Sequence, residues 1–326
     1  MSERAAPLGA RRRHDVATLV AKAREGDPRA VARLISLVEN GDPALAEVAA
    51  ALAPHTGRAQ VVGLTGAPGV GKSTTTNELV RAFRKAGRRV GVLAVDPSSP
   101  FTGGAILGDR VRMQEHTTDP GVYIRSMSSR GQLGGLAAAT PQAVRVLEGA
   151  GCDVILVETV DVGQAEVEIA SLADTTLVLL APGMGDAIQA VKAGVLEIAD
   201  VFVINKADRP GADITYRDIQ GMLALGERAA GDWRPQVVRA TAVRGEGIDD
   251  VQAAIEKHRE WLTATGNLRL RRERRASVEV EAIALGTLRA RIGDVREGTA
   301  LATLAAKVAA GEIDPYAAAD ELIKDL

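Results

Sequence analysis

A glycine-rich turn after a β-branched apolar run is the feature that most constrains how this chain can fold. The run Val61–Thr65 leads into a stretch that matches the pattern G-x-x-x-x-G-K-[ST]. Gly66, Gly69 and Gly71 permit backbone conformations that a Cβ excludes, so successive N–H groups can point into one concavity. The helix predicted to begin near Lys72 directs its unpaired N–H groups at the same place. The stretch therefore predicts a phosphate-binding loop between a strand and a helix.

Two side chains of this loop have the chemistry of a nucleotide site. Lys72 can reach the β- and γ-phosphates, and the hydroxyl of Ser73 can ligate Mg²⁺. A chance glycine-rich turn is the alternative, but the strand before the loop and the helix after it favour phosphate binding. The residues expected to contact the nucleotide here are Gly66, Ala67, Pro68, Gly69, Val70, Gly71, Lys72, Ser73 and Thr74.

The spacing of apolar residues changes at Gln60 and then alternates between two periods. Short apolar runs predict strands at 60–65, 90–95, 122–127, 153–158, 175–181, 201–205 and 236–240. Helical patterns separate them at 72–87, 135–149, 187–198, 213–229 and 246–263. Strands that are apolar on both faces predict an α/β fold of the P-loop NTPase type, with a mostly parallel sheet covered by helices on both faces. In such a sheet, ligands bind at the carboxyl ends of the strands.

The segments on either side of this core are predicted to be helical. We expect a disordered basic tail at 1–13, an N-terminal helical segment at 14–56, the P-loop domain at 57–262 and a C-terminal helical appendage at 263–326. The run Leu268–Arg275 is rich in arginine. It is either a solvated helix face or a contact with another subunit or an acidic partner.

Composition excludes several classes of function. Lys plus Arg number 40 against 42 Asp plus Glu, and aromatic residues make up 2%, so nucleic acid is not an expected partner. No apolar run is long enough to span a bilayer. One cysteine, Cys152, allows no internal disulfide, which suits a cytoplasmic protein.

A second motif points to the base of the nucleotide. Asn205, Lys206 and Asp208 form an N-K-x-D pattern directly after a predicted strand. The carboxylate of Asp208 can accept from both N1–H and the 2-amino group of guanine, whereas adenine has an acceptor at N1 and lacks the 2-amino group. A site built on such a pair discriminates strongly, so GTP or GDP is the expected ligand. Thr241 and Ala242, after the last strand, are expected to supply backbone contacts to guanine O6.

Several acids follow the strands that are expected to flank the phosphate-binding loop. Asp96 ends the second predicted strand, and Asp109 lies in the glycine- and serine-rich loop after it; either could hold Mg²⁺, although Asp96 with Pro97 also reads as a turn. Glu158 stands where P-loop proteins place an acid near Mg²⁺ or the attacking water. Gln164 either orients that water or is a surface residue. The predicted metal set is thus Ser73, Asp96, Asp109 and Glu158, and the predicted catalytic set is Lys72, Glu158 and Gln164.

On these motifs the chain resembles the MeaB/ArgK group of G3E P-loop GTPases, relatives of the human methylmalonic aciduria type A protein. The resemblance covers nearly the whole chain. It is most specific in 61–208, and it is carried by Gly66–Ser73, Val95–Pro100, Gly108–Met113, Glu158–Val160, Val162–Gln164 and Asn205–Asp208.

This resemblance implies a GTPase chaperone for adenosylcobalamin-dependent methylmalonyl-CoA mutase. Such proteins couple GTP binding and hydrolysis to cofactor loading and to protection of the mutase, and they are typically homodimers joined through their C-terminal helices. The resemblance also implies that Ser73, Asp96, Asp109 and Glu158 line the Mg²⁺–phosphate site. The segment from Gly183 to Lys192 resembles a further mobile loop that signals to the mutase.

Three other functions remain open on the sequence. One is an ATP-dependent kinase, since relatives carried a transport-kinase label, but Asn205–Asp208 argues against it. Another is a metal-delivery GTPase, although four dispersed histidines and one cysteine provide no ligand spacing. A third is a nucleotide-binding module with little turnover. Phosphoryl transfer depends mainly on positioning, so a GTPase with these parts can be slow alone and stimulated by its partner.

One residue departs from the family pattern. The family has Glu-x-x-Gly after the fourth predicted strand, and here Asp161 replaces that glycine, whose N–H normally meets the γ-phosphate. Asp161 keeps an N–H but adds a Cβ and a negative charge. If the side chain faces the nucleotide rather than solvent, repulsion costs on the order of 1 kcal/mol.

We therefore expect Asp161→Gly to bind GTP more tightly relative to GDP, or to switch more completely, than the natural chain. The measurement is the ratio of GTP to GDP affinity, together with the turnover rate. Equal affinity and turnover in the two proteins would show that Asp161 points away from the phosphates.

Overall fold

The structure is a computed structural model of the chain. It describes residues 15–96, 114–116, 118–128, 139–159, 164–183, 196–226, 229, 231–297 and 299–324. The chain divides into two compact units, Met1–Arg271 and Arg272–Leu326.

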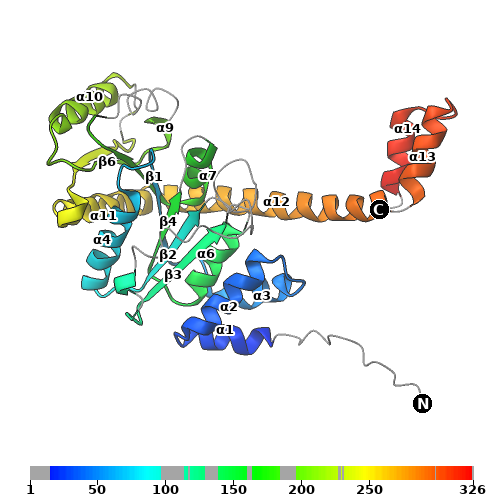
Figure 1. Ribbon diagram of the computed structural model, residues 1–326, viewed down its shortest axis with the longest axis horizontal. Helices are drawn as coiled ribbons and strands as arrows, with labels where there is room; N and C mark the ends of the chain where they lie inside the picture. The colour runs from blue at the N-terminus through cyan, green and yellow to red at the C-terminus, as the bar shows by residue number, and fades with distance from the viewer. Residues whose placement is uncertain are drawn as a thin grey trace, which may run out of the picture. The chain divides into compact units, whose positions relative to one another are not determined.

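Seven strands form a single sheet in the first unit (Figure 1), in the order β3-β2-β4-β1-β5-β6-β7. Every strand pair in the described residues is parallel. This confirms the predicted α/β fold. The strands are β1 (Gln60–Thr65), β2 (Val90–Asp96), β3 (Val122–Ser128), β4 (Val154–Thr159), β5 (Thr175–Leu180), β6 (Val201–Ile204) and β7 (Gln236–Arg239).

The helices alternate with the strands, as the apolar period predicts. Those predicted at 72–87, 213–229 and 246–263 are confirmed as α4 (Lys72–Lys85), α10 (Ala212–Leu225) and α11 (Ile248–Ala264). Of the two helices predicted at 135–149 and 187–198, the described parts are α6 (Thr140–Gly149) and α9 (Leu196–Ile198). Further elements among the described residues of this unit are η2 (Gln114–His116), α7 (Gln164–Leu172) and η4 (Ala242–Arg244).

Helices cover both faces of the sheet because the central strands are buried on both sides. In β2, Val92 belongs to the core that β1, β4 and β5 share with α4 and α11, whereas Leu93 belongs to the core shared with α6 and α7. Helix α10 covers the second of these faces over β5 and β6, where Phe202 and Ile219 are fully buried. Doubly buried strands of this kind read as continuous apolar runs, which is why the sequence predicts them well.

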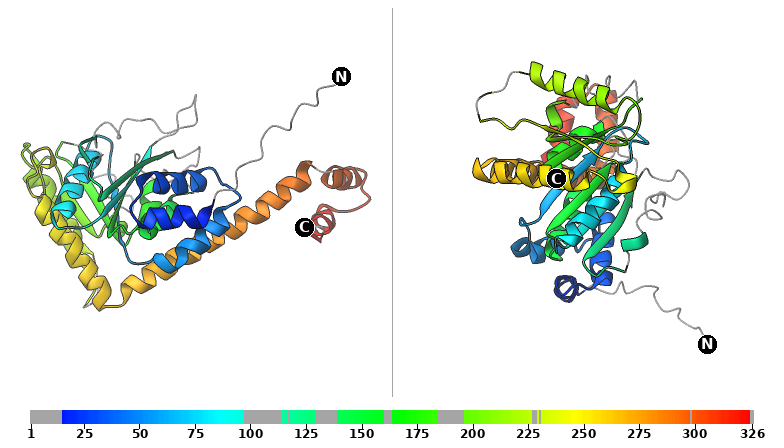
Figure 2. Two further views of the ribbon diagram at one scale, coloured as in Figure 1. Left: turned by 90° about the horizontal axis from the view of Figure 1, so that it is seen from below. Right: turned by 90° about the vertical axis from the view of Figure 1, so that its left-hand side faces the viewer.

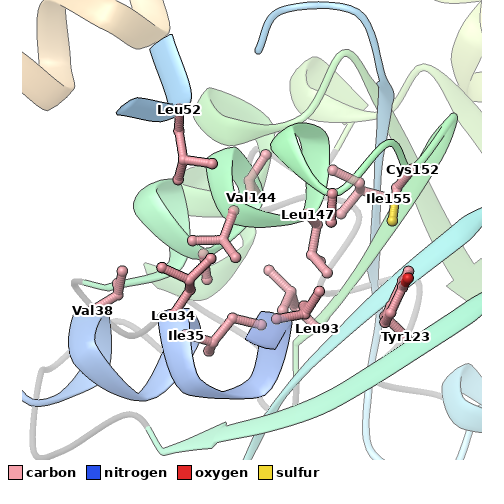
Figure 3. Close-up of a cluster of buried hydrophobic side chains, with 14 of the residues drawn as sticks. Leu34, Ile35, Val38, Leu52, Leu93, Tyr123, Val144, Leu147, Cys152 and Ile155 are labelled. Carbon is pink, nitrogen blue, oxygen red and sulfur yellow. The ribbon is translucent and has the colours of Figure 1, made fainter. Parts of the chain in front are cut away.

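Three N-terminal helices add a layer outside α6: α1 (Val16–Arg24), α2 (Pro28–Glu39) and α3 (Leu45–Leu52), followed by the short η1 (Ala53–His55). Figure 2 (left) shows these blue helices beside α6, away from cyan α4. Leu34, Ile35 and Val38 of α2 point toward Val144 and Leu147 of α6 (Figure 3), and all five are buried.

The two Gly-Asp-Pro breaks between these helices differ. At the first, Gly26 has a φ of 96° and Asp27 caps α2 by accepting from the N–H of Arg29 at 2.8 Å. At the second, Asp42 accepts from Ala44 N at 2.9 Å within a turn, and α3 begins only at Leu45. Asp42 therefore closes a turn two residues before the N-cap of α3, Ala44, and does not itself cap that helix.

A buried polar cluster joins the amino ends of β5 and β6 to the start of the next helix, α12 (Asn267–Glu297). Arg271 makes two hydrogen bonds to Asp200, at 2.7 and 2.8 Å, and a third to the carbonyl of Asp174 at 3.0 Å. His258 is fully buried, with Nδ1 2.9 Å from Thr175 Oγ1 and Nε2 3.3 Å from Asp200 Oδ1. Both tryptophans of the chain, Trp233 and Trp261, pack against the His258 ring.

The second unit is helical, as predicted. It contains the rest of α12, then α13 (Thr299–Ala309) and α14 (Pro315–Lys324), which pack on each other and bury Leu304 and Ala318. Asp314 accepts from the backbone N–H groups of Tyr316 and Ala317 and so caps α14. Among the described residues, every helix of the chain is too short or too polar to cross a membrane.

The buried histidine makes the stability of the first unit sensitive to acid. Burial lowers the pKa of His258 from 6.5 to about 4, more than Asp200 can raise it. His258 is therefore protonated below about pH 6.5 in the unfolded chain, but only below about pH 4 in the folded chain. We expect the free energy of unfolding to fall by about 3 kcal/mol across this interval.

Urea unfolding at pH 7, 6, 5 and 4 measures this effect. His258→Gln is expected to remove the decline between pH 6.5 and 4, whereas His55→Gln, a change at a partly exposed histidine, retains it. An identical decline in all three proteins would contradict the assignment.

Candidate nucleotide-binding site

The loop between β1 and α4 has the shape that the glycine-rich motif predicts. Gly66 has a φ of 141°, and a Cβ on it would lie 2.4 Å from the carbonyl oxygen of Leu179 in β5. Gly71, at the N-cap of α4, has a φ of 98°, and a Cβ there would lie 2.3 Å from Asn205 Nδ2. Both positions exclude side chains, because the loop runs against neighbouring strands at the carboxyl edge of the sheet.

Lys72, the first residue of α4, is held against this loop. Its side chain is nearly buried, and Nζ donates to the carbonyl oxygens of Gly66 at 2.7 Å and Ala67 at 3.3 Å. The ammonium group therefore lies over the glycine-rich turn, where the motif predicts that the phosphates bind.

Ser73 and Glu158 meet across two neighbouring strand ends. Ser73 Oγ donates to Glu158 Oε1 at 2.7 Å, and Thr76 Oγ1 lies 2.9 Å from Oε2. The carboxylate is buried, and β4 carries it into register with Leu64 of β1. The sequence analysis missed Thr76, although it stands three residues after Ser73 on the same helix and therefore shares its face.

The other predicted metal and catalytic residues are described only in part. Asp96 ends β2 one residue beyond the pair Val95–Thr159, so its backbone lies at the same edge as Glu158. Its side chain, that of Gln164 at the start of α7, and the whole of Asp109 and Asp161 lie outside the described residues. So does the segment 184–192. Among described side chains, no group of three or more His, Cys, Asp or Glu residues surrounds a common point.

Asn205 joins the loop to the base-side residues. Its side chain is buried; Nδ2 donates to Val70 O at 2.7 Å, and Oδ1 accepts from Ala242 N at 3.1 Å. The adjacent Lys206 has a φ of 56°, and its Nζ donates to Gly69 O at 2.6 Å. The structure therefore brings together three segments that are far apart in sequence: 66–74, 205–208 and 241–242.

Asp208 lies at the outer end of this group, with its side chain 33% exposed. Arg244 Nη1 is 3.5 Å from Asp208 Oδ2, and the same guanidinium contacts Glu246. The hydrogen bond to Glu246 is the main reason that the pKa of Arg244 is raised. Sequence reasoning missed Arg244 and Glu246; the only signal was their place in the Arg-Gly-Glu-Gly turn after Ala242.

This arrangement defines the class of the protein. The loop has three glycines at positive φ, a lysine that bonds to its carbonyl oxygens, a serine hydroxyl on a buried carboxylate and an N-K-x-D segment bonded to it. These are the parts of a P-loop nucleotide-binding protein. The hydroxyl and the carboxylate are oxygen donors of the kind that Mg²⁺ prefers, so this pair fits that ion.

Comparison with known proteins then identifies the family. The model of methylmalonyl Co-A mutase-associated GTPase MeaB matches residues 31–296. A Pyrococcus abyssi protein, provisionally named as a GTPase, is 48% identical over 312 residues, covering 94% of this chain and 96% of its own. The mitochondrial methylmalonic aciduria type A homolog of Mus musculus is 37% identical over 270 residues, which cover 81% of this chain and 64% of its own.

A solved structure is also similar in fold. The crystal structure of the LAO/AO transport system kinase has a TM-score of 0.70 at 27% identity, covering 97% of this chain and 99% of that one. The chain belongs to the MeaB family of GTPases.

The contacts of Asn205 predict a loss of stability on substitution. Asn205→Ala leaves Val70 O and Ala242 N without their partner and is expected to lower the free energy of unfolding by about 1–3 kcal/mol. Asn205→Asp is expected to cost more, because a carboxylate oxygen then faces the carbonyl of Val70. Urea unfolding measures both. The surface change Asn267→Ala, which removes a bond to Thr265 Oγ1, should stay within about 0.5 kcal/mol of the natural chain. Equal stability in all of these proteins would contradict the linking role of Asn205.

Proposed function

We propose that this chain binds and hydrolyses GTP as a chaperone of adenosylcobalamin-dependent methylmalonyl-CoA mutase. One observation supports the nucleotide part: Asn205, three residues before Asp208, bonds to both the phosphate-binding loop at Val70 and the Ala242 backbone. The description of the matching family as mutase-associated supports the partner.

In this proposal each end of the nucleotide has its own residues. The N–H groups of Gly66–Thr74 and the ammonium of Lys72 bind the phosphates. Asp208 accepts from guanine N1–H and the 2-amino group, and the backbone of Thr241 and Ala242 faces O6. An ATP-dependent kinase is not favoured, because the carboxylate of Asp208 has no donor for adenine N1, and adenine has no 2-amino group to donate to that carboxylate.

Glu158 acts through Ser73 in the described geometry. Because the Ser73 hydroxyl donates its hydrogen bond to the carboxylate, the lone pairs of the hydroxyl oxygen remain available to a cation. Ser73 and Glu158 would hold Mg²⁺ together with Asp96 and Asp109, and the bound ion would neutralise charge on the β- and γ-phosphates. Gln164 is proposed to orient the attacking water.

The second unit supports a homodimer. Its part of α12 exposes five described large apolar side chains, Val278, Val280, Ile283, Leu285 and Leu288. Three of them, Val278, Leu285 and Leu288, recur at spacings of seven and three residues. An apolar stripe at this period suits packing against a partner helix. A second copy of the chain is the proposed partner there, and the mutase is the proposed client.

The mutase role predicts a change in hydrolysis rate. GTP hydrolysis by the full chain is expected to rise about tenfold or more when a purified adenosylcobalamin-dependent methylmalonyl-CoA mutase is added, because groups from a partner can complete a phosphoryl-transfer site. The measurement is phosphate release with GTP, with ATP as the matched control. An unchanged rate together with no complex in gel filtration would contradict the chaperone role and leave a nucleotide-binding module with little turnover.

A further inference from the structure

Two charged residues outside every motif named above, Arg244 and Glu246, form a cluster with Asp208 of the N-K-x-D segment. Arg244 contacts two carboxylates, those of Asp208 and Glu246. It reaches Glu246 through Nε at 3.0 Å and Nη2 at 3.0 Å, and it reaches Asp208 through Nη1 at 3.5 Å. The two bonds to Glu246 are therefore the close ones, and the contact with Asp208 is a looser ion pair.

Two glycines shape the turn that carries Arg244 and Glu246. Gly245 and Gly247 have φ values of 71° and 75°, and a Cβ on Gly247 would lie 2.2 Å from the carbonyl oxygen of Arg239. The N–H of Thr241 donates to the carbonyl of Glu246 at 2.9 Å and closes the loop. The backbone thus presents Arg244 and Glu246 as a bidentate pair beside Asp208.

We propose that Arg244 is a positioning residue that sets the selectivity of the base site by orienting the carboxylate of Asp208, and that Glu246 holds Arg244 at the right distance. This inference rests on the proposed function, because it takes Asp208 as the acceptor for guanine. Guanine needs both carboxylate oxygens at once, one for N1–H and one for the 2-amino group. A cation 3.5 Å from Oδ2 favours one orientation of that carboxylate and, at this distance, leaves its lone pairs for the base.

Glu246 has a separate task in this arrangement. At 3.5 Å the guanidinium is beyond the usual range of an N–H···O hydrogen bond to Asp208. Without Glu246, Arg244 is free to close on Asp208 as a planar fork and to compete with the base for the same lone pairs. Removing Glu246 should therefore weaken guanine binding only when Arg244 is present.

The test compares the affinities of GDP, IDP and ADP for the full chain by calorimetry. IDP lacks the 2-amino group, so its affinity reports the contact between N1–H and Asp208 without the contact of the 2-amino group. Arg244→Ala is expected to lower GDP affinity by up to about fivefold, the upper end of the range for an exposed ion pair, and to lower IDP affinity less, so that the GDP/IDP ratio falls. Arg244→Lys is expected to give an intermediate ratio, because a point charge cannot hold both carboxylates in one plane.

Two further variants separate the role of Glu246 from a general charge effect. Glu246→Ala should lower GDP affinity, and the double variant Arg244→Ala/Glu246→Ala should match Arg244→Ala alone. Arg209→Ala is the matched control, because Arg209 adjoins Asp208 in sequence, is exposed and makes no described ion pair. It is expected to leave the GDP/IDP ratio unchanged.

Asp208→Ala distinguishes a failure of the proposed guanine site from a failure of the proposed role of Arg244. If it leaves GDP affinity unchanged, or if ADP binds the natural chain as tightly as GDP, the proposed guanine site itself fails. If Asp208→Ala weakens GDP binding but Arg244→Ala preserves the GDP/IDP ratio, or Arg209→Ala lowers it equally, the guanine site stands and the role of Arg244 is overturned.

Discussion

The buried amide of Asn205 is the contact on which the candidate site depends. Parallel strands bring their carboxyl ends to one edge of a sheet, but they do not fix the loops that follow. Asn205 does so by donating to Val70 O and accepting from Ala242 N. An aspartate has no donor for Val70, and an alanine leaves both partners unsatisfied in a buried place. The side chain therefore joins the phosphate loop to the loop after β7. This link sets the distance between the phosphate end and the base end of the candidate site.

The Ser73–Glu158 pair shows the same logic at the phosphate end. A carboxylate that is 2% exposed is costly to keep unless donors surround it. Ser73 and Thr76 supply two hydroxyls from one face of α4. The pair thereby fixes the first turn of α4 against β4, so that Lys72 and the helix N-terminus keep their direction over the glycine-rich turn. Electrostatics and packing support each other here, since removing the carboxylate would also loosen the helix that carries the lysine.

Sequence reasoning succeeded where the signal is local and failed where it is not. Strands buried on both faces appear as continuous apolar runs, and the glycine, lysine and serine of the loop lie within one short stretch, so fold class and motif positions were predictable. The pairing of Arg244 with Asp208 and of Arg271 with Asp200 joins residues 36 and 71 positions apart, and no period marks either pair. Before α3, Asp42 accepts from Ala44 N within a turn, so a residue type that commonly caps helices stabilises a turn here instead.

The amino ends of the strands explain how the site edge can stay in place. Asp174, before β5, accepts from Val61 N at the start of β1, and Asp200, before β6, accepts from Thr176 N at the start of β5. β1 leads into the phosphate loop, and β6 leads into Asn205. The two aspartates therefore fix the register of these strands at their amino ends, while the carboxyl ends of the same strands carry the proposed ligand contacts. Arg271 bonds to the Asp174 carbonyl and to the Asp200 carboxylate at once. The first turn of α12 is thus bonded to the strands that position both halves of the nucleotide site. A substitution at Arg271 would therefore affect that site by shifting the register of the strands, since Arg271 itself makes no described contact there.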